Sequence, residues 1–202
     1  MADLSFAVTF DYRCPFARNA HEHVVAALQD GADWDVQFLP FSLSQTKVPD
    51  GDVDVWDEPT KDSGIIALQA GVALRELQPD RFLDAHLALF SLRHDRGGDL
   101  RSEDEVRDAL SGVGIDPGPV FVEISSGAPL ETIRKEHEAA VTNHRVFGVP
   151  TFIAGDEAVF VRVMSRSGDD PAESRRTVER VVGDLLVGWT DLNEFKRTTI
   201  AR

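Results

Sequence analysis

The sequence predicts an α/β fold in which an all-helical lobe is inserted between the strands of one sheet. Residues 1–41 show the hydrophobic patterns of a strand, a helix and a second strand, in that order. Residues 42–139 carry helical patterns and loops, and residues 140–202 return to two short strand patterns and a helix. We therefore expect residues 1–41 and 140–202 to form one domain, with residues 42–139 as a lobe inserted into it.

The first unit is identified by two changes of hydrophobic period. Apolar residues alternate with smaller or polar ones from Leu4 to Asp11, which is typical of a strand. From Pro15 to Gln29 they repeat at helical spacing, and from Trp34 to Phe41 they alternate again. A helix between two such strands predicts a right-handed βαβ unit with parallel strands.

The inserted lobe is predicted to be helical after a polar loop at 42–60. Its helical patterns share apolar residues three or four positions apart. They cover Ser63 to Leu77, Asp80 to Leu92, a helix that Ser102 caps and that runs to Leu110, a single turn from Val120 to Ile124, and Pro129 to Phe147.

The chain then returns to the sheet. Gly148 is expected to end the last helix of the lobe. Strands are predicted at Thr151 to Ala154 and Val159 to Val163, joined as a hairpin across the intervening glycine turn. Asp170 to Leu186 is predicted to be the final helix, and the segment after Gly188 receives no role.

Cys14 is the only cysteine of the chain, and it lies between the first strand and the first helix. The dipole and the unpaired N–H groups of a helix start favour negative charge, so the sequence predicts added thiolate character there. Pro15 suits the first helical position because it lacks an N–H group. Ala17 stands where a dithiol site would carry a second cysteine, so Cys14 has no partner in its own chain.

The overall charge excludes some classes of partner. A formal net charge of −14 argues against nucleic acid and against acidic membrane surfaces, because both need clustered Lys and Arg. Met1 to Leu4 does not begin a secretory signal, and no segment approaches the ~20 apolar residues of a membrane span. We therefore expect a cytoplasmic protein, and a single cysteine fits a reducing compartment.

Two short motifs in this order carry a resemblance to a known family. Residues 14–17 read Cys-Pro-Phe-Ala after a strand, and residues 148–151 read Gly-Val-Pro-Thr before a hairpin, with the helical insertion between them. Nearly the whole chain thus resembles the DsbA-type branch of the thioredoxin superfamily. That branch also contains kappa-class glutathione transferases, 2-hydroxychromene-2-carboxylate isomerases and mycothiol-dependent reductases. The resemblance implies a thioredoxin-like fold.

The resemblance also implies roles for the residues of both motifs. Cys14 would be the catalytic cysteine, Pro15 and Phe16 the pair that tunes it, and Ala17 would occupy the place of the resolving cysteine. Pro150 would be the cis-proline of the fold. Val149 to Thr151 would offer backbone groups to a substrate or a small thiol. The alanine at position 17 argues against any disulfide oxidase activity that needs a dithiol.

Other side chains near these motifs have two interpretations each. Tyr12 and Phe16 either line a pocket for the thiol or pack in the core. Arg13 either assists a thiolate or is solvated. Trp56 is the one large apolar side chain of the loop at 42–60, so it either closes over the site as part of a lid or packs elsewhere.

The six histidines do not predict a metal site. His21 lies two turns beyond Cys14 on the predicted helix, too far for proton transfer to the sulfur, and it and His23 are expected at the surface. The other histidines lack the spacing of metal ligands: His86, His94, His137 and His144. We expect no metal and no tightly bound cofactor.

Three classes of function remain open. The first is a single-cysteine thiol oxidoreductase or thiol transferase, in which the Cys14 thiolate attacks a mixed disulfide or an electrophile and an external thiol resolves the adduct. The second is an isomerase or transferase of the kappa or hydroxychromene type, in which the protein stabilises the thiolate of a bound thiol. The third is a binding protein that kept the fold without the chemistry.

The expected co-substrate is a low-molecular-weight thiol. Arg outnumbers Lys and Asp outnumbers Glu, a bias associated with high-GC genomes such as those of actinobacteria. Mycothiol is the expected thiol for an actinobacterial protein, and glutathione otherwise. The sequence leaves the electrophile unidentified and leaves a homodimer open.

Overall fold

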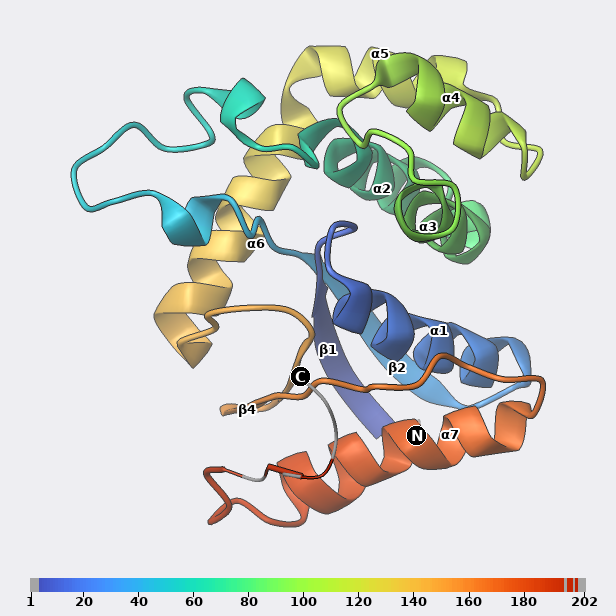
Figure 1. The fold of residues 1–202 in the computed structure, drawn as a ribbon, viewed down its shortest axis with the longest axis vertical. Helices are drawn as coiled ribbons and strands as arrows, with labels where there is room; N and C mark the ends of the chain where they lie inside the picture. The colour runs from blue at the N-terminus through green and yellow to red at the C-terminus, as the bar shows by residue number, and fades with distance from the viewer. Residues whose placement is uncertain (1–3, 195, 198, 200–202) are drawn as a thin grey trace.

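The computed structural model of the protein describes residues 4–194, 196–197 and 199. The chain forms a part that contains a sheet and, above it, a part built from helices (Figure 1). Within the described residues, no helix is long and apolar enough to cross a membrane.

The sheet has four strands in the order β2-β1-β3-β4. Strands β1 (Leu4–Phe10) and β2 (Trp34–Pro40) pair in parallel, as the strand, helix, strand pattern predicts. Strands β3 (Thr151–Ala154) and β4 (Glu157–Phe160) form the predicted antiparallel hairpin, and β3 also pairs antiparallel with β1. Strand β4 lies two residues earlier than the sequence predicts, so Phe160 pairs opposite the first residue of β3.

The lobe contains the predicted helices with some shifts in their bounds. The helix that the sequence predicts as a single turn is longer, because the Asp116 side chain accepts a hydrogen bond from Gly118 N and caps it. Two short 3-10 turns lie in the loop before the lobe, η1 (Gln45–Lys47) and η2 (Pro59–Lys61). The helices are α2 (Ile65–Leu77), α3 (Pro79–His94), α4 (Glu103–Ser111), α5 (Pro117–Ser126) and α6 (Ala128–His144).

Helix α6 ends before the glycine that the sequence predicts as its stop. Arg145 adopts the left-handed conformation with φ of 54°. Its N–H and that of Val146 then bond back to the carbonyls of Val141 and Ala140, which closes the helix. Gly148 is therefore free to form part of the loop that leads into β3.

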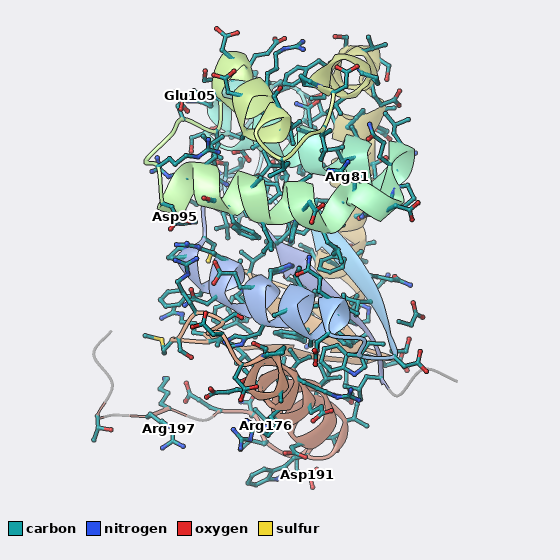
Figure 2. All side chains as sticks on the ribbon, turned by 90° about the vertical axis from the view of Figure 1, so that its right-hand side faces the viewer. Arg81, Asp95, Glu105, Arg176, Asp191 and Arg197 are labelled. Carbon is teal, nitrogen blue, oxygen red and sulfur yellow. The ribbon has the colours of Figure 1, made fainter. Side chains whose placement is uncertain are left out.

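Helix α1 (Pro15–Gln29) lies between two other helices. Figure 2 shows α3 of the lobe on one side of α1 and α7 (Pro171–Glu179) on the other, and α1 contacts both. Asp170 caps α7 by accepting from Ala172 N, as expected, and the chain continues from Arg180 to Val187 as a π-helix, η3. Because α1 is covered twice, most of its surface is buried, and Cys14 stands at its start.

A continuous hydrophobic core joins the sheet to the lobe. Fully buried side chains of β1, such as Phe10, belong to the same cluster as Leu74 of α2 and Leu89 of α3. Each such side chain contributes roughly 1.5–3 kcal/mol by its burial. The residues between β1 and α1 lie where these elements meet, so lobe and sheet together position the loop that carries Cys14.

Candidate active site around Cys14

Cys14 is the N-cap residue of α1. Its backbone is extended, with φ of −90° and ψ of 117°, and its N–H bonds to the Asp11 carbonyl at 3.0 Å. Sγ accepts a hydrogen bond from Ala17 N at 3.5 Å, and the thiol donates to the carbonyl of Val149 at 3.3 Å. The side chain is only 9% exposed. Pro15, at the first helical position, is exposed.

The structure corrects the expectation of added thiolate character at Cys14. Burial raises the pKa of the Cys14 thiol, and the nearby Asp11 carboxylate raises it further. The first-turn N–H groups of Ala17 and Phe16 act in the opposite direction, but they do not outweigh burial. A thiol whose pKa lies above its ordinary value of about 8.5 stays protonated at neutral pH.

The loop before β3 supplies the other side of the site. The Val149-Pro150 peptide bond is cis, as the resemblance implies. Thr151 is buried, and both of its donors are used: its N–H bonds to Thr9 Oγ1 at 2.9 Å and its hydroxyl bonds to the Gly148 carbonyl at 2.8 Å. These bonds hold the loop against β1, with the Val149 carbonyl facing the Cys14 sulfur.

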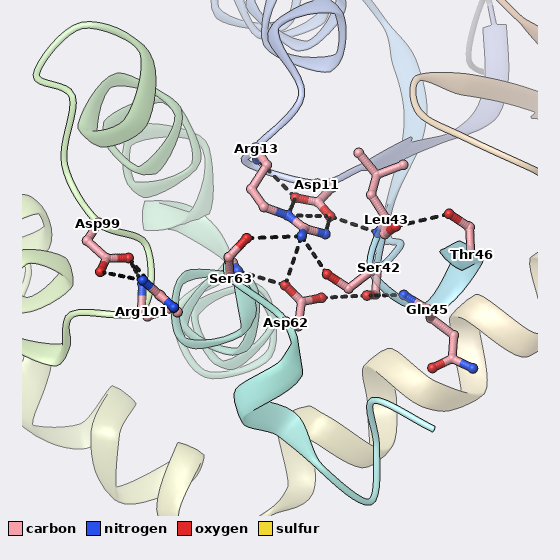
Figure 3. Close-up of polar contacts among 12 residues, drawn as sticks. Asp11, Arg13, Ser42, Leu43, Gln45, Thr46, Asp62, Ser63, Asp99 and Arg101 are labelled. Atoms are coloured by element: carbon pink, nitrogen blue, oxygen red, sulfur yellow. Dashed lines mark hydrogen bonds and ion pairs between the residues drawn. The ribbon is translucent and has the colours of Figure 1, made fainter. Parts of the chain in front are cut away.

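Arg13 is neither solvated nor dedicated to the thiol, because two carboxylates bind it (Figure 3). Its guanidinium bonds to Asp11 through Nη2 at 2.5 Å and Nε at 3.0 Å, and Nη1 lies 3.4 Å from Asp62. Burial opposes the charge of Arg13, but the hydrogen bonds and charges of the two aspartates raise its pKa.

The remaining oxygens of the two carboxylates are also satisfied. Asp11 accepts from the backbone N–H groups of Arg13 and Leu43, and Asp62 accepts from Ser42 Oγ and Gly64 N. Two buried carboxylates thus share one guanidinium. Burial, followed by the charge of Asp11, raises the pKa of Asp62. Because two carboxylates bind the Arg13 guanidinium, its charge is compensated within this cluster.

Tyr12 is part of a buried chain of hydrogen bonds that the sequence does not predict. Tyr12 Oη lies 2.8 Å from His86 Nδ1, His86 Nε2 lies 2.9 Å from His21 Nδ1, and His21 Nε2 lies 3.1 Å from the carbonyl of Thr9. All three side chains have 0% exposure. The expectation that His21 lies at the surface is therefore wrong: α3 covers this face of α1.

The acceptor at the end of the chain fixes every proton in it. The Thr9 carbonyl can only accept, so His21 Nε2 carries a proton. Burial lowers the pKa of His21 to about 4 and that of His86 well below its ordinary value, so both rings are neutral. His21 Nδ1 then accepts from His86 Nε2–H, and Tyr12 O–H donates to His86 Nδ1.

The lobe also holds Tyr12 at its backbone and its ring. His94 Nε2 lies 2.9 Å from the Tyr12 carbonyl oxygen, and the ring of Phe90 packs edge-on at 4.8 Å between centroids. A Cβ at Gly71 of α2 would lie 2.3 Å from Tyr12 Oη, so the glycine gives the hydroxyl its room. Tyr12 accordingly packs in the core and fixes the Cys14 loop to α2 and α3.

Arg162 is a charged residue near the thiol that sequence reasoning missed. Its guanidinium carbon lies 5.2 Å from the ring centre of Phe16 and 5.6 Å from that of Phe160. Phe147, which is 69% exposed, packs against Phe160 with ring centroids 5.0 Å apart and ring planes tilted by 47°. The positive charge of Arg162 acts to lower the pKa of Cys14, although less than burial raises it. Phe16, for which the sequence leaves both pocket lining and core packing open, is half-buried at this surface.

Trp56 is a core residue in the structure. It is 9% exposed and packs edge-on against His137 at 5.4 Å, and His137 stacks in turn on Phe41 at 4.1 Å. The loop that carries Trp56 is thus anchored by this side chain, and a role for it in binding stays a prediction.

His23 is also buried, which contradicts its expected place at the surface. Its Nδ1 lies 3.0 Å from Ser174 Oγ of α7, and Nε2 lies 3.2 Å from the Ser165 carbonyl. The covering helix α7 explains the difference. Within the described residues, no group of His, Cys, Asp and Glu is placed to hold a metal ion.

Two surface pockets lie away from Cys14. One of about 490 Å³ is lined by residues of β2, α2 and α3, among them Trp34 and Phe82. Another of about 330 Å³ lies between the sheet and α6, lined by residues that include Gln37 and Asn143. Neither lining includes Cys14 or the Val149 loop.

Comparisons with known proteins agree with this architecture. A family model described as a DSBA-like thioredoxin domain matches residues 7–166. No curated protein sequence matches the chain.

Solved structures match over most of the chain. A 2-hydroxychromene-2-carboxylate isomerase matches with a TM-score of 0.63 and 16% identity, covering 90% of this chain and 95% of its own. A periplasmic thioredoxin-like protein from Salmonella enterica serovar Typhimurium matches with a TM-score of 0.61 and 21% identity, covering 91% and 84%. A thioredoxin-like oxidoreductase from Silicibacter pomeroyi DSS-3 matches with 0.58 and 19%, covering 90% and 88%. At these identities the likeness shows a thioredoxin-like fold with a helical insertion.

Proposed function

The chain belongs to the DSBA-like thioredoxin domain family, and from this membership we propose that it is an enzyme that acts with a low-molecular-weight thiol at Cys14. The thiol has to come from outside the chain, because Cys14 is its only cysteine and Ala17 occupies the place of a second one. The co-substrate would lie along the Val149 to Thr151 loop, with its sulfur beside Cys14.

The class that the geometry favours is a transferase or isomerase of the kappa or hydroxychromene type. The observation that carries this choice is the geometry of the Cys14 thiol, which is buried and donates to the Val149 carbonyl, and burial raises its pKa. In that state Cys14 is a poor nucleophile but a hydrogen-bond donor. The bound thiol would lose its proton to solvent, and the Cys14 S–H would turn from the Val149 carbonyl to stabilise the resulting thiolate, which then attacks the electrophile.

A single-cysteine oxidoreductase is the second candidate, and specific contacts favour it. Ala17 N–H points at Sγ, and both this donor and Arg162 favour the thiolate form of Cys14. In this mechanism the Cys14 thiolate attacks the small-thiol sulfur of a mixed disulfide and the substrate thiol leaves; a second molecule of the small thiol then releases Cys14 and forms a disulfide with the first. The mechanism requires a thiolate that burial and Asp11 oppose, so we place it second.

Replacing the sulfur by oxygen separates the two classes. Cys14→Ser keeps a hydrogen-bond donor but cannot form a disulfide, whereas Cys14→Ala removes both properties. Each variant is assayed for glutathione or mycothiol conjugation to an aromatic electrophile and for reduction of a mixed disulfide. Conjugation retained in Cys14→Ser but lost in Cys14→Ala supports the proposal. Equal loss in both, with disulfide reduction present only in the wild type, supports the oxidoreductase.

Mass spectrometry of the protein purified from its own cells identifies the thiol. A mixed disulfide at Cys14 names the molecule directly, because the chain has no second cysteine to remove it. We propose mycothiol for an actinobacterial source and glutathione otherwise. A protein that binds neither thiol in calorimetry would instead be a non-catalytic binding protein.

A further inference from the structure

Arg162 occupies a defined position between the two halves of the site. It lies two residues after the end of β4, and its guanidinium lies over both Phe16 and Phe160. Phe16 belongs to the first turn of α1, two residues after Cys14. Phe160 pairs with Thr151, the residue after the cis-proline. The two rings therefore hold the cation at the border that Cys14 shares with the Val149 loop.

The charge of Arg162 is uncompensated, unlike that of a neighbouring arginine. Among the described residues, no carboxylate lies within 4.0 Å of its guanidinium. Arg166, four residues later on the same segment, is paired with Glu22 at 2.7 Å and with Asp95 at 3.4 Å. Contacts with aromatic faces hold a guanidinium in place but leave its N–H edges free to donate. An unpaired arginine at the site is notable in a chain with a net charge of −14.

We propose that Arg162 is a carboxylate-binding subsite, which selects anionic molecules for reaction at Cys14. A guanidinium matches a planar carboxylate with two parallel N–H···O bonds. The exposed ring of Phe147, which packs against Phe160, extends the same surface with an apolar side chain. The ligand class is thus a carboxylate attached to an apolar or aromatic body. This inference rests on one part of the proposed function, namely that small molecules reach Cys14.

The test compares two reagents that differ in charge but attack the same thiolate. Iodoacetate carries a carboxylate and iodoacetamide is neutral, so the ratio of their rate constants at Cys14 cancels the thiolate fraction. In Arg162→Gln this ratio should fall about two- to fivefold, the range of an exposed ion pair. Arg166→Gln removes the same charge from the same segment and should leave the ratio unchanged. An unchanged ratio in Arg162→Gln overturns the proposal.

A second arm asks whether the carboxylate belongs to the thiol. Glutathione and its diethyl ester are titrated into the wild type and Arg162→Gln by calorimetry. A preference for the free acid that disappears in the variant assigns the subsite to the thiol. Equal binding of both forms, together with a charge-dependent alkylation ratio, assigns it to the electrophile. The alkylation ratio needs no enzymatic turnover, so it stands or falls separately from the proposed function.

Discussion

Gly71→Ala tests the packing that fixes the Cys14 loop. Gly71 lies within α2, where helix propensity alone favours alanine by about 1 kcal/mol. The structure predicts the opposite sign, because the new Cβ would lie 2.3 Å from Tyr12 Oη and 3.1 Å from two ring carbons. The tyrosine cannot move away, since it is fully buried and bonded to His86.

The size of the effect follows from the contacts that the methyl group disturbs. Overpacking a core costs about 1–3 kcal/mol. If the ring shifts, the buried His86 Nδ1 loses its donor, which adds about 1–3 kcal/mol. After the gain in propensity is subtracted, we expect Gly71→Ala to lose about 1–5 kcal/mol of stability.

Urea unfolding followed by circular dichroism measures the change. Gly183→Ala is the matched control, because Gly183 is also helical but a Cβ there meets no atom within 4 Å. The control should be neutral or stabilised by up to about 1 kcal/mol. If Gly71→Ala were as stable as the control, Tyr12 would not be fixed as described.

Three further predictions concern buried polar groups. Tyr12→Phe leaves His86 Nδ1 without a donor and should cost about 1–3 kcal/mol in urea unfolding; no change would show that the hydrogen bond contributes nothing. Arg13→Gln leaves two buried carboxylates uncompensated and should cost about 3–5 kcal/mol, so a variant with wild-type stability would contradict the described cluster. His21 and His137 have pKa values of about 4 in the folded protein, below the unfolded value of 6.5, so the unfolded state binds more protons as the pH falls. The contribution of each histidine to the free energy of unfolding should therefore be fully present above about pH 6.5. It should decrease by about 2 kcal/mol by pH 5. His137→Leu should flatten this dependence, and a wild type equally stable at pH 7 and pH 5 would refute the assignment.

The sequence predicts the elements well where periodicity is strong. Strands β1 and β2 and helices α1 to α3 bury apolar side chains in the core. This burial leaves a periodic pattern of apolar residues, which can be recognised in the sequence. It predicts helix ends less well. Arg145 ends α6 in a left-handed conformation that arginine rarely adopts. From the sequence alone Gly148 is the more typical helix end, but the helix ends before it.

The candidate site shows where local reasoning stops. His21 is buried because α3 covers it, and its partner on α3, His86, lies 65 residues later in the sequence. Arg13 is paired with Asp62, which no local pattern connects to it. Arg162 reaches the site only because the hairpin of β3 and β4 brings it back to Phe16. In each case the partner is set by tertiary packing, which spacing along the chain does not encode.

The pKa of Cys14 shows the same limit with a chemical consequence. A helix start favours the thiolate, and that part of the argument holds, because Ala17 N–H does contact Sγ. Burial is a tertiary effect, and as the largest contribution it determines the direction of the shift.

The most direct test of the account is a titration of the Cys14 thiol in the free protein. The ultraviolet absorbance of the thiolate is recorded against pH for the wild type and for Cys14→Ser, and their difference isolates the single cysteine. We expect a pKa above the ~8.5 of an ordinary thiol, as burial beside Val149 and Asp11 requires. A pKa well below that value would contradict the neutral donor and would make Cys14 a thiolate nucleophile.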